Sequence, residues 1–173
     1  MKKTDSRIYN ITLTGIFAAL ITIFTAYIGH IPVGAHGGYV HFGDGLIYLA
    51  AAILPAPYAM AAGAIGGGLA DLLTAPAWAI ATIIIKALLV LPFTNKGSTI
   101  LNKRNYIAPV IAYLISHTGY FIAEAVMFGI KTALLSGLTG GLVQSGGSMV
   151  FFILLGQALD KISFKSKVEV TNG

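Results

Sequence analysis

The chain has no cysteine and few charged residues. The lack of cysteine excludes disulfides, thiolate catalysis and metal sites built on cysteine. Only 10% of the 173 residues are charged, whereas a soluble domain carries about 25%, so the composition argues against a water-soluble fold. The net charge of +5 does not indicate nucleic-acid binding, because the basic residues flank long apolar runs.

Catalytic motifs are also lacking. The sequence contains no His-Glu-x-x-His zinc motif, no Gly-x-Ser-x-Gly elbow and no phosphate-binding loop. The glycine-rich residues 63–68 lack the lysine and the following hydroxyl residue that such a loop needs. We therefore predict that the chain is not an enzyme and holds no metal or cofactor of its own. Any step driven by ATP would require another subunit.

Hydrophobic residues make up 56% of the chain, and the mean hydropathy is +0.82. A run of about 20 apolar residues can cross a bilayer as a helix. The sequence predicts a single all-α membrane domain over residues 1–173, with six transmembrane helices at residues 9–28, 44–54, 58–73, 78–93, 106–128 and 141–159. The second is too short to cross a bilayer unless residues from Tyr39 onward extend it.

The basic residues predict the orientation in the membrane. They gather before the first predicted helix, between the fourth and fifth, and after the last: Lys2, Lys3 and Arg7; Lys96, Lys103 and Arg104; Lys161, Lys165 and Lys167. Lys and Arg in short loops mark the cytoplasmic side. An even number of spans therefore places both termini in the cytoplasm, and most of the remaining polar residues at the outer side.

Residues 36–44, His-Gly-Gly-Tyr-Val-His-Phe-Gly-Asp, form a glycine-rich connection at that outer side. Glycine allows the backbone to approach a ligand closely, Tyr39 could stack on a planar ligand, and His36 and His41 could hydrogen-bond to it. We interpret this stretch as the lid of a small-molecule site; an interfacial loop with aromatic anchors is the alternative. Asp44 is predicted to cap the next helix, and Asp71 to reach water from the end of its helix.

Lys86 falls near the middle of the fourth predicted helix, where a charge costs several kcal/mol and normally faces a cavity or a counter-ion. Trp78 and Thr82 share its helical face. The candidate partners of Lys86 are Asp71, Glu124 and a ligand. A purely structural Lys–Asp pair is the alternative.

A polar face follows the fifth predicted helix. Tyr113, His117, Tyr120 and Glu124 recur at intervals of four, three and four residues, so they lie on one side of the helix. Gly140, Gln144 and Ser148 line the outer part of the sixth helix in the same way. Together these residues suit the wall of a site for a planar, hydrogen-bonding solute. The alternative is a structural polar seam between helices.

Small residues form stripes on two other helices. Thr12, Gly15, Ala19, Thr22 and Ala26 share one face of the first helix, and Ala59, Gly63, Gly67 and Ala70 share one face of the third. Such stripes let helix backbones approach closely. For the first helix the stripe indicates either packing within the protein or docking of a partner membrane protein. For the third we predict packing inside the bundle.

Three motifs carry a family resemblance. His-Phe-Gly-Asp-Gly at 41–45, Gly-Ala-Ile-Gly-Gly-Gly-Leu-Ala-Asp at 63–71 and Ala-Thr-Ile-Ile-Ile-Lys-Ala-Leu at 81–88 resemble the substrate-binding S components of energy-coupling factor (ECF) vitamin transporters. The resemblance is to the riboflavin-type group, which includes members assigned to hydroxymethylpyrimidine or pyridoxine. It implies a multi-pass protein of the bacterial plasma membrane that captures a vitamin. Pyridoxine or hydroxymethylpyrimidine is favoured, with riboflavin or pantothenate next.

The resemblance also implies partners and site residues. An S component delivers its vitamin by docking on a transmembrane coupling protein, which carries two cytoplasmic ATPases that use ATP. The docking face would include Gly15, Ala19 and Thr22. The vitamin site would map onto residues of the lid and of the fourth, fifth and sixth helices: Tyr39, His41, Lys86, His117, Tyr120, Glu124 and Gln144. The alternative function is that of a non-transport assembly factor or channel subunit.

Overall fold

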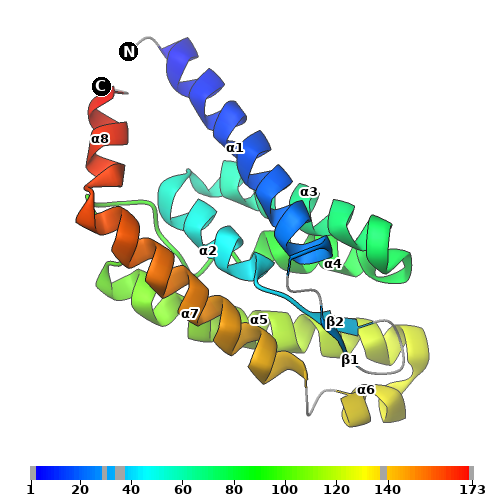
Figure 1. Ribbon diagram of the computed structural model, residues 1–173. Coiled ribbons are helices and arrows are strands. Elements are labelled where there is room, and N and C mark those ends of the chain that lie inside the picture. The colour runs from blue at the N-terminus through cyan, green and yellow to red at the C-terminus, as the bar shows by residue number, and fades with distance from the viewer. Residues whose placement is uncertain (1–2, 29–30, 34–37, 137–139, 172–173) are drawn as a thin grey trace.

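The computed structural model describes residues 3–28, 31–33, 38–136 and 140–171. It is an all-α bundle with one small hairpin (Figure 1). The helices are α1 (Lys3–Ala26), α2 (Gly43–Ile53), α3 (Ala56–Thr74), α4 (Ala79–Leu88), α5 (Lys103–Phe128), α6 (Ile130–Ser136), α7 (Gly140–Lys161) and α8 (Phe164–Thr171), with a 3-10 turn η1 (Pro76–Trp78) before α4. The strands β1 (Ile31–Val33) and β2 (Gly38–Val40) pair antiparallel, with Pro32 opposite Tyr39.

All six predicted hydrophobic helices are present, as α1, α2, α3, α4, α5 and α7. The fourth ends at Leu88 rather than at residue 93, because Pro92 lacks an amide proton and disfavours helical geometry in the residue before it. The hairpin and the short helices α6 and α8 were not predicted. Tyr39 belongs to β2 and does not extend α2.

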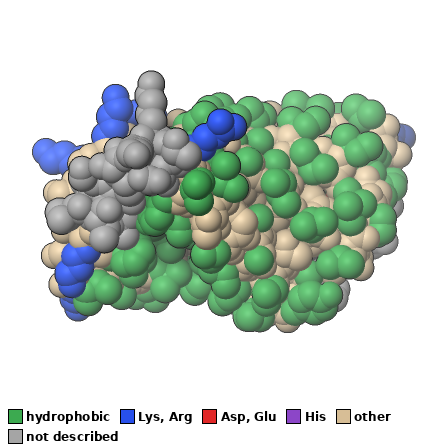
Figure 2. Space-filling view, turned by 90° about the horizontal axis from the view of Figure 1, so that it is seen from above, with side chains coloured by type: hydrophobic (Ala, Val, Ile, Leu, Met, Phe, Trp, Pro, Cys, Tyr) green, Lys and Arg blue, Asp and Glu red, His purple; other side chains and the backbone are tan. Residues whose placement is uncertain are grey.

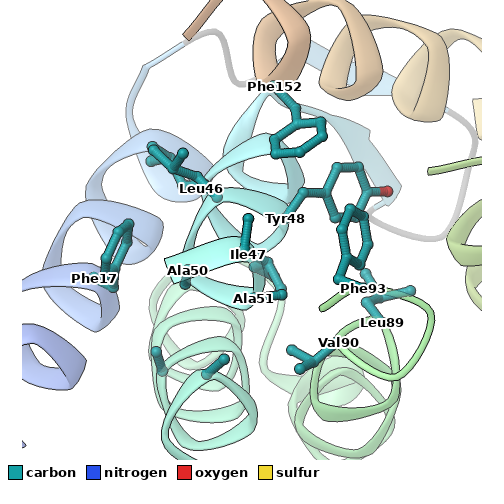
Figure 3. Close-up of a cluster of buried hydrophobic side chains, with 14 of the residues drawn as sticks. Phe17, Leu46, Ile47, Tyr48, Ala50, Ala51, Leu89, Val90, Phe93 and Phe152 are labelled. Atoms are coloured by element: carbon teal, nitrogen blue, oxygen red, sulfur yellow. The ribbon is translucent and has the colours of Figure 1, made fainter. Parts of the chain in front are cut away.

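The short helix α2 lies in the middle of the bundle. Every residue from Gly43 to Ala52 is buried, so this helix faces other helices on all sides. Its side chains form the centre of the hydrophobic core, with Tyr48 packed against Phe93 and Phe152 (Figure 3). Because other helices surround it, this 11-residue helix does not have to span the bilayer in contact with lipid.

Glycines on α3 allow two helices to pack against it closely. A Cβ atom added to Gly66 would lie 2.7 Å from Ile21 Cβ of α1, and one added to Gly67 would lie 2.7 Å from Lys86 Cγ of α4. Both distances are shorter than van der Waals contact. Ala59 and Ala70 on the same helix are fully buried. The predicted internal packing of α3 is confirmed.

The outer surface of the bundle is apolar. Within the described residues, three helical segments are long and apolar enough to cross a membrane: Ser6–Ala26, Lys103–Phe128 and Gly141–Lys161. Ile80 and Val126 are 78% and 81% exposed, which suits a surface in lipid rather than in water. Figure 2 shows hydrophobic side chains over much of one face, with most of the visible Lys and Arg side chains toward one end. The start of α1 and helix α8 lie at one end, and the hairpin and α6 at the other (Figure 1).

Buried hydrogen bonds fasten the connection between α4 and α5 at the basic end. The Asn105 side chain accepts from Thr94 N at 2.9 Å and donates to the carbonyl oxygens of Thr94 and Ile100 at 2.9 and 2.7 Å. The carboxylate of Asp160, near the end of α7, accepts from the amides of Ile100 and Leu101 at 2.7 and 2.9 Å. These two side chains replace regular secondary structure as partners for the backbone of this connection.

We expect Asn105→Ala to lower the free energy of unfolding by about 2–4 kcal/mol, because three hydrogen bonds are lost at a fully buried side chain. Thermal unfolding of the purified protein in detergent measures the change. Asn95→Ala, a change in the same connection, is the control and should have little effect. Equal unfolding temperatures for Asn105→Ala and the unaltered protein would contradict this role.

Candidate functional site

A buried ion pair lies at the centre of the polar residues. Lys86 Nζ of α4 lies 2.6 Å from Asp44 Oδ1 in the first turn of α2, and the two side chains are 3% and 1% exposed. The Lys86 ammonium also lies 5.4 Å from the centre of the Tyr120 ring of α5. A charge buried in a membrane protein needs such partners. The pair therefore joins α2, α4 and α5 at one point.

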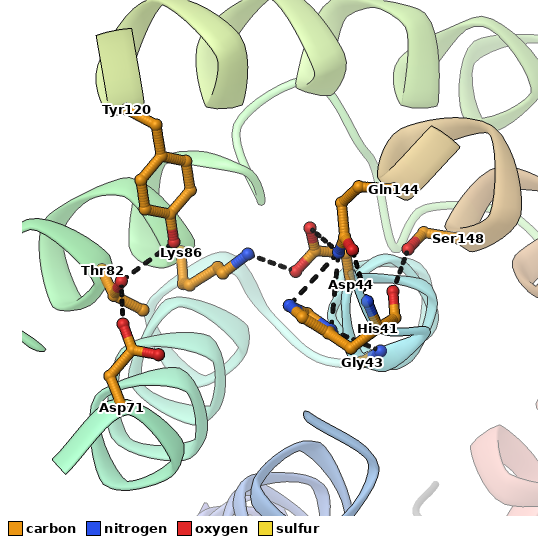
Figure 4. A network of polar contacts seen from close by, with 9 residues as sticks. All are labelled: His41, Gly43, Asp44, Asp71, Thr82, Lys86, Tyr120, Gln144 and Ser148. Carbon is orange, nitrogen blue, oxygen red and sulfur yellow. Dashed lines mark hydrogen bonds and ion pairs between the residues drawn. The ribbon is translucent and has the colours of Figure 1, made fainter. Parts of the chain in front are cut away.

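Gln144 of α7 ties the ion pair to the residues before α2 (Figure 4). Its Nε2 donates to Asp44 Oδ2 at 3.2 Å, and its Oε1 accepts from the His41 amide at 2.6 Å. Ser148, one turn further along α7, donates to the His41 carbonyl at 3.4 Å. Side chains of α7 thus hold His41, the residue after β2, and the start of α2 against that helix.

The imidazole of His41 is oriented by the start of α2. Its Nδ1 accepts a hydrogen bond from Gly43 N at 2.9 Å, which places the ring proton on Nε2 when the imidazole is neutral. Gly43 cannot be replaced by a larger residue without movement, because a Cβ there would lie 2.0 Å from Thr25 Oγ1 and 3.0 Å from His41 Nδ1. The His-Phe-Gly-Asp motif therefore supplies the turn that brings Asp44 to Lys86.

A second polar cluster lies on the other side of Lys86. The Thr82 hydroxyl donates to Asp71 Oδ2 of α3 and lies 2.9 Å from the Tyr120 hydroxyl. Trp78 packs edge-on against the Tyr120 ring at 5.9 Å between ring centres. Trp78, Thr82 and Lys86 share one face, as predicted. Tyr120 lies between the two clusters, and its ring presents an aromatic surface to the lysine.

The predicted polar face of α5 spans the space between α4 and α7. Tyr120 lies beside α4, whereas the His117 ring packs on Tyr113 at 5.5 Å and lies close to Gly141 of α7. Glu124, one turn beyond Tyr120, is buried at 8% exposure. His41, Lys86, Tyr120 and Gln144 are brought together in one set of contacts. His117 and Glu124 flank this set along α5.

Other predicted residues lie elsewhere. The side chain of Tyr39 and all of His36 fall outside the described part of the structure. On α1, Gly15 and Ala19 are exposed, and a Cβ added to Gly15 would meet nothing within 4 Å. Thr22 instead faces α3, where its hydroxyl lies 3.1 Å from the Gly66 carbonyl oxygen. The part of the stripe open to a partner is therefore formed by Thr12, Gly15 and Ala19.

Two sequence predictions about the acidic residues were wrong. Asp44 makes no capping hydrogen bond to the backbone of α2. It is instead the counter-ion of Lys86, for which the sequence suggests Asp71, Glu124 or a ligand as the partner. Asp71 does not extend into water, because it is 4% exposed and accepts from Thr82. The available signal was the scarcity of acid: the chain has six Asp and Glu residues in all, so a buried lysine has few partners.

The chemistry of the site is that of binding. Hydrogen-bonding amide, imidazole, phenol and hydroxyl groups alternate with aromatic rings, as in sites that hold small polar molecules. Among the described residues, no group of three or more His, Asp or Glu side chains could hold a metal ion. These groups, buried inside an apolar helical bundle, suit the binding of a small polar molecule.

Comparisons with known proteins identify the class. The family model of the ECF-type riboflavin transporter S component matches residues 5–161. The chain belongs to this family, and is therefore a membrane-embedded, vitamin-binding subunit of an ECF transporter rather than an enzyme. A protein of Pyrococcus woesei described as an "uncharacterized protein in gap 3'region" is 31% identical over 111 residues, which cover 63% of this chain and 74% of that protein. No solved structure matches the chain.

Proposed function

We propose that this chain captures a small, uncharged, water-soluble vitamin at the outer side of the plasma membrane. The ion pair of Lys86 and Asp44 carries the proposal, with Tyr120 and Gln144 beside it. Pyridoxine or hydroxymethylpyrimidine is the favoured ligand and riboflavin the next. The protein crosses the membrane six times with both termini in the bacterial cytoplasm. It delivers the vitamin by docking on a coupling protein that carries two ATPases.

The balance of charge favours an uncharged ligand. Within the described residues of the site, Lys86 is the one buried Lys or Arg, and Asp44 already neutralises it at 2.6 Å. An anionic ligand would have to compete with Asp44 or enter without a counter-ion, and an unpaired buried charge costs several kcal/mol. This disfavours pantothenate, whose carboxylate is ionised at neutral pH.

Matched pairs of ligands test this selectivity. We expect the purified protein to bind pyridoxine or riboflavin and to bind the corresponding 5′-phosphate at least about 100-fold more weakly, because the described residues of the site offer the phosphate no unpaired Lys or Arg. Calorimetric titration measures both members of each pair in the same buffer. Tighter binding of the phosphate than of the parent vitamin would contradict an uncharged-ligand site.

A non-transport membrane subunit is the second candidate, because a lysine satisfied inside the protein also suits a structural polar seam. Copurification separates the two functions. A transport subunit, tagged and extracted in mild detergent, should bring down a membrane coupling protein with two ATPases. Vitamin uptake by cells should also require intact ATPases. Uptake into liposomes holding this chain alone would contradict dependence on partners.

A further inference from the structure

Tyr48 is a buried polar residue whose hydroxyl has no hydrogen-bond partner within the described part of the chain. Its side chain is 0% exposed. Most buried hydroxyls in proteins are hydrogen-bonded, and an unsatisfied one costs about 1–3 kcal/mol. Phenylalanine would fill nearly the same space without that cost. The residues that the structure describes therefore supply no partner for this hydroxyl.

The position of Tyr48 points to the vitamin site. Tyr48 follows Asp44 by one helical turn, so the two residues lie on the same side of α2. The phenol is near enough to Asp44 and Lys86 to interact electrostatically with both. In Figure 3 its hydroxyl extends away from α2 and beyond the Phe93 and Phe152 rings. Tyr48 thus lies one turn deeper in the bundle than the ion pair.

The immediate surroundings of the ring are poor in alternative partners. The ring stacks on Phe93 at 4.9 Å and meets Phe152 edge-on at 6.0 Å. A buried water needs two to four polar partners, and the nearby Lys86 and Asp44 are already engaged with each other and with Gln144. Phe93 and Phe152 form an apolar surface against the Tyr48 ring, and the Tyr48 hydroxyl extends beyond them.

We propose that Tyr48 is a ligand-binding residue whose hydroxyl hydrogen-bonds the innermost polar group of the vitamin. This proposal rests on the proposed function. It places a hydroxyl, ring nitrogen or carbonyl of an uncharged ring at the deepest point of the site, between the ion pair and the two phenylalanine rings. A phenol both donates and accepts, so it can pair with any of these groups.

The test is Tyr48→Phe, which removes only the hydroxyl. Purified protein is titrated with pyridoxine, hydroxymethylpyrimidine and riboflavin, and the variant is compared using the ligand that the unaltered protein binds most tightly. We expect the dissociation constant to rise about tenfold, while the unfolding temperature without ligand stays the same or rises. Tyr106→Phe, at an exposed position near the basic end of α5, is the matched control and should bind normally.

Two failures can be told apart. If the unaltered protein binds none of the three vitamins, the proposed function fails and this inference falls with it. If it binds one and Tyr48→Phe binds that vitamin within twofold of the unaltered protein, only the role of Tyr48 is overturned. A raised unfolding temperature with unchanged affinity would mean that the hydroxyl is an uncompensated group of the core.

Discussion

Lys86→Met is expected to abolish vitamin binding and to lower the free energy of unfolding by about 3–5 kcal/mol, because it leaves the Asp44 carboxylate buried without its counter-ion. Methionine matches the length of the lysine side chain, so packing against Gly67 is largely kept. Binding is measured by calorimetry and unfolding by thermal denaturation in the same detergent. Lys96→Met, in the exposed connection after α4, is the control and should change neither.

The double variant Asp44→Asn/Lys86→Met separates the structural role of the pair from its contact with the vitamin. With both charges removed, most of the stability should return, since replacing a whole buried pair is often nearly neutral. Binding should stay impaired, because the Lys86 ammonium beside Tyr120 is then still missing. If the double variant recovers full binding, Lys86 positions other residues of the site and does not contact the vitamin. If Lys86→Met alone changes neither binding nor the free energy of unfolding, the buried ion pair is contradicted.

Gly15→Leu is expected to abolish vitamin uptake by cells while leaving binding by the purified protein unchanged. Thr12, Gly15 and Ala19 form the exposed part of the α1 stripe, and no described atom outside the helix lies within 4 Å of a Cβ added at Gly15. A leucine there disturbs nothing inside the protein but would separate α1 from a helix packed closely against it. Uptake of labelled vitamin and copurification of the coupling protein are the measurements.

Gly146→Leu provides a matched control for this change. Gly146 lies on α7, is exposed, and likewise has no atom within 4 Å of an added Cβ. The same substitution at this position should spare both binding and uptake. Equal loss of uptake in the two variants would show that any added bulk on the lipid-facing surface stops transport. Loss of binding in Gly15→Leu alone would instead indicate a packing role within the protein.

Much of the fold could be predicted because helix periodicity and hydrophobicity are local properties of the sequence. The glycines and alanines of α3 likewise predicted close helix packing. Gly66 and Gly67 lie where α1 and α4 pack against α3. The hairpin was missed because three-residue strands give too little alternation to be read from sequence. The predicted fourth helix was too long because the apolar run continues past Leu88, where Pro92 ends α4.

The sequence indicated which residues form the candidate site but not which of them pair with one another. The resemblance to ECF S components placed His41, Lys86, Tyr120 and Gln144 in one site, and the structure brings them into contact. The pairing of Asp44 with Lys86 joins residues 42 positions apart. It depends on the crossing of α2 and α4, which no local pattern encodes. Tyr48 was passed over because a lone tyrosine in an apolar helix usually belongs to the core.

The most direct measurement is a calorimetric titration of the purified chain, in detergent and without ATP or any partner protein, with pyridoxine, hydroxymethylpyrimidine and riboflavin. If this chain is the vitamin-capturing subunit, one of the three should bind at one molecule per chain with a dissociation constant below about 1 μM. Absence of binding to all three, or binding only when the ATPases are present, would contradict capture of the vitamin by this chain alone.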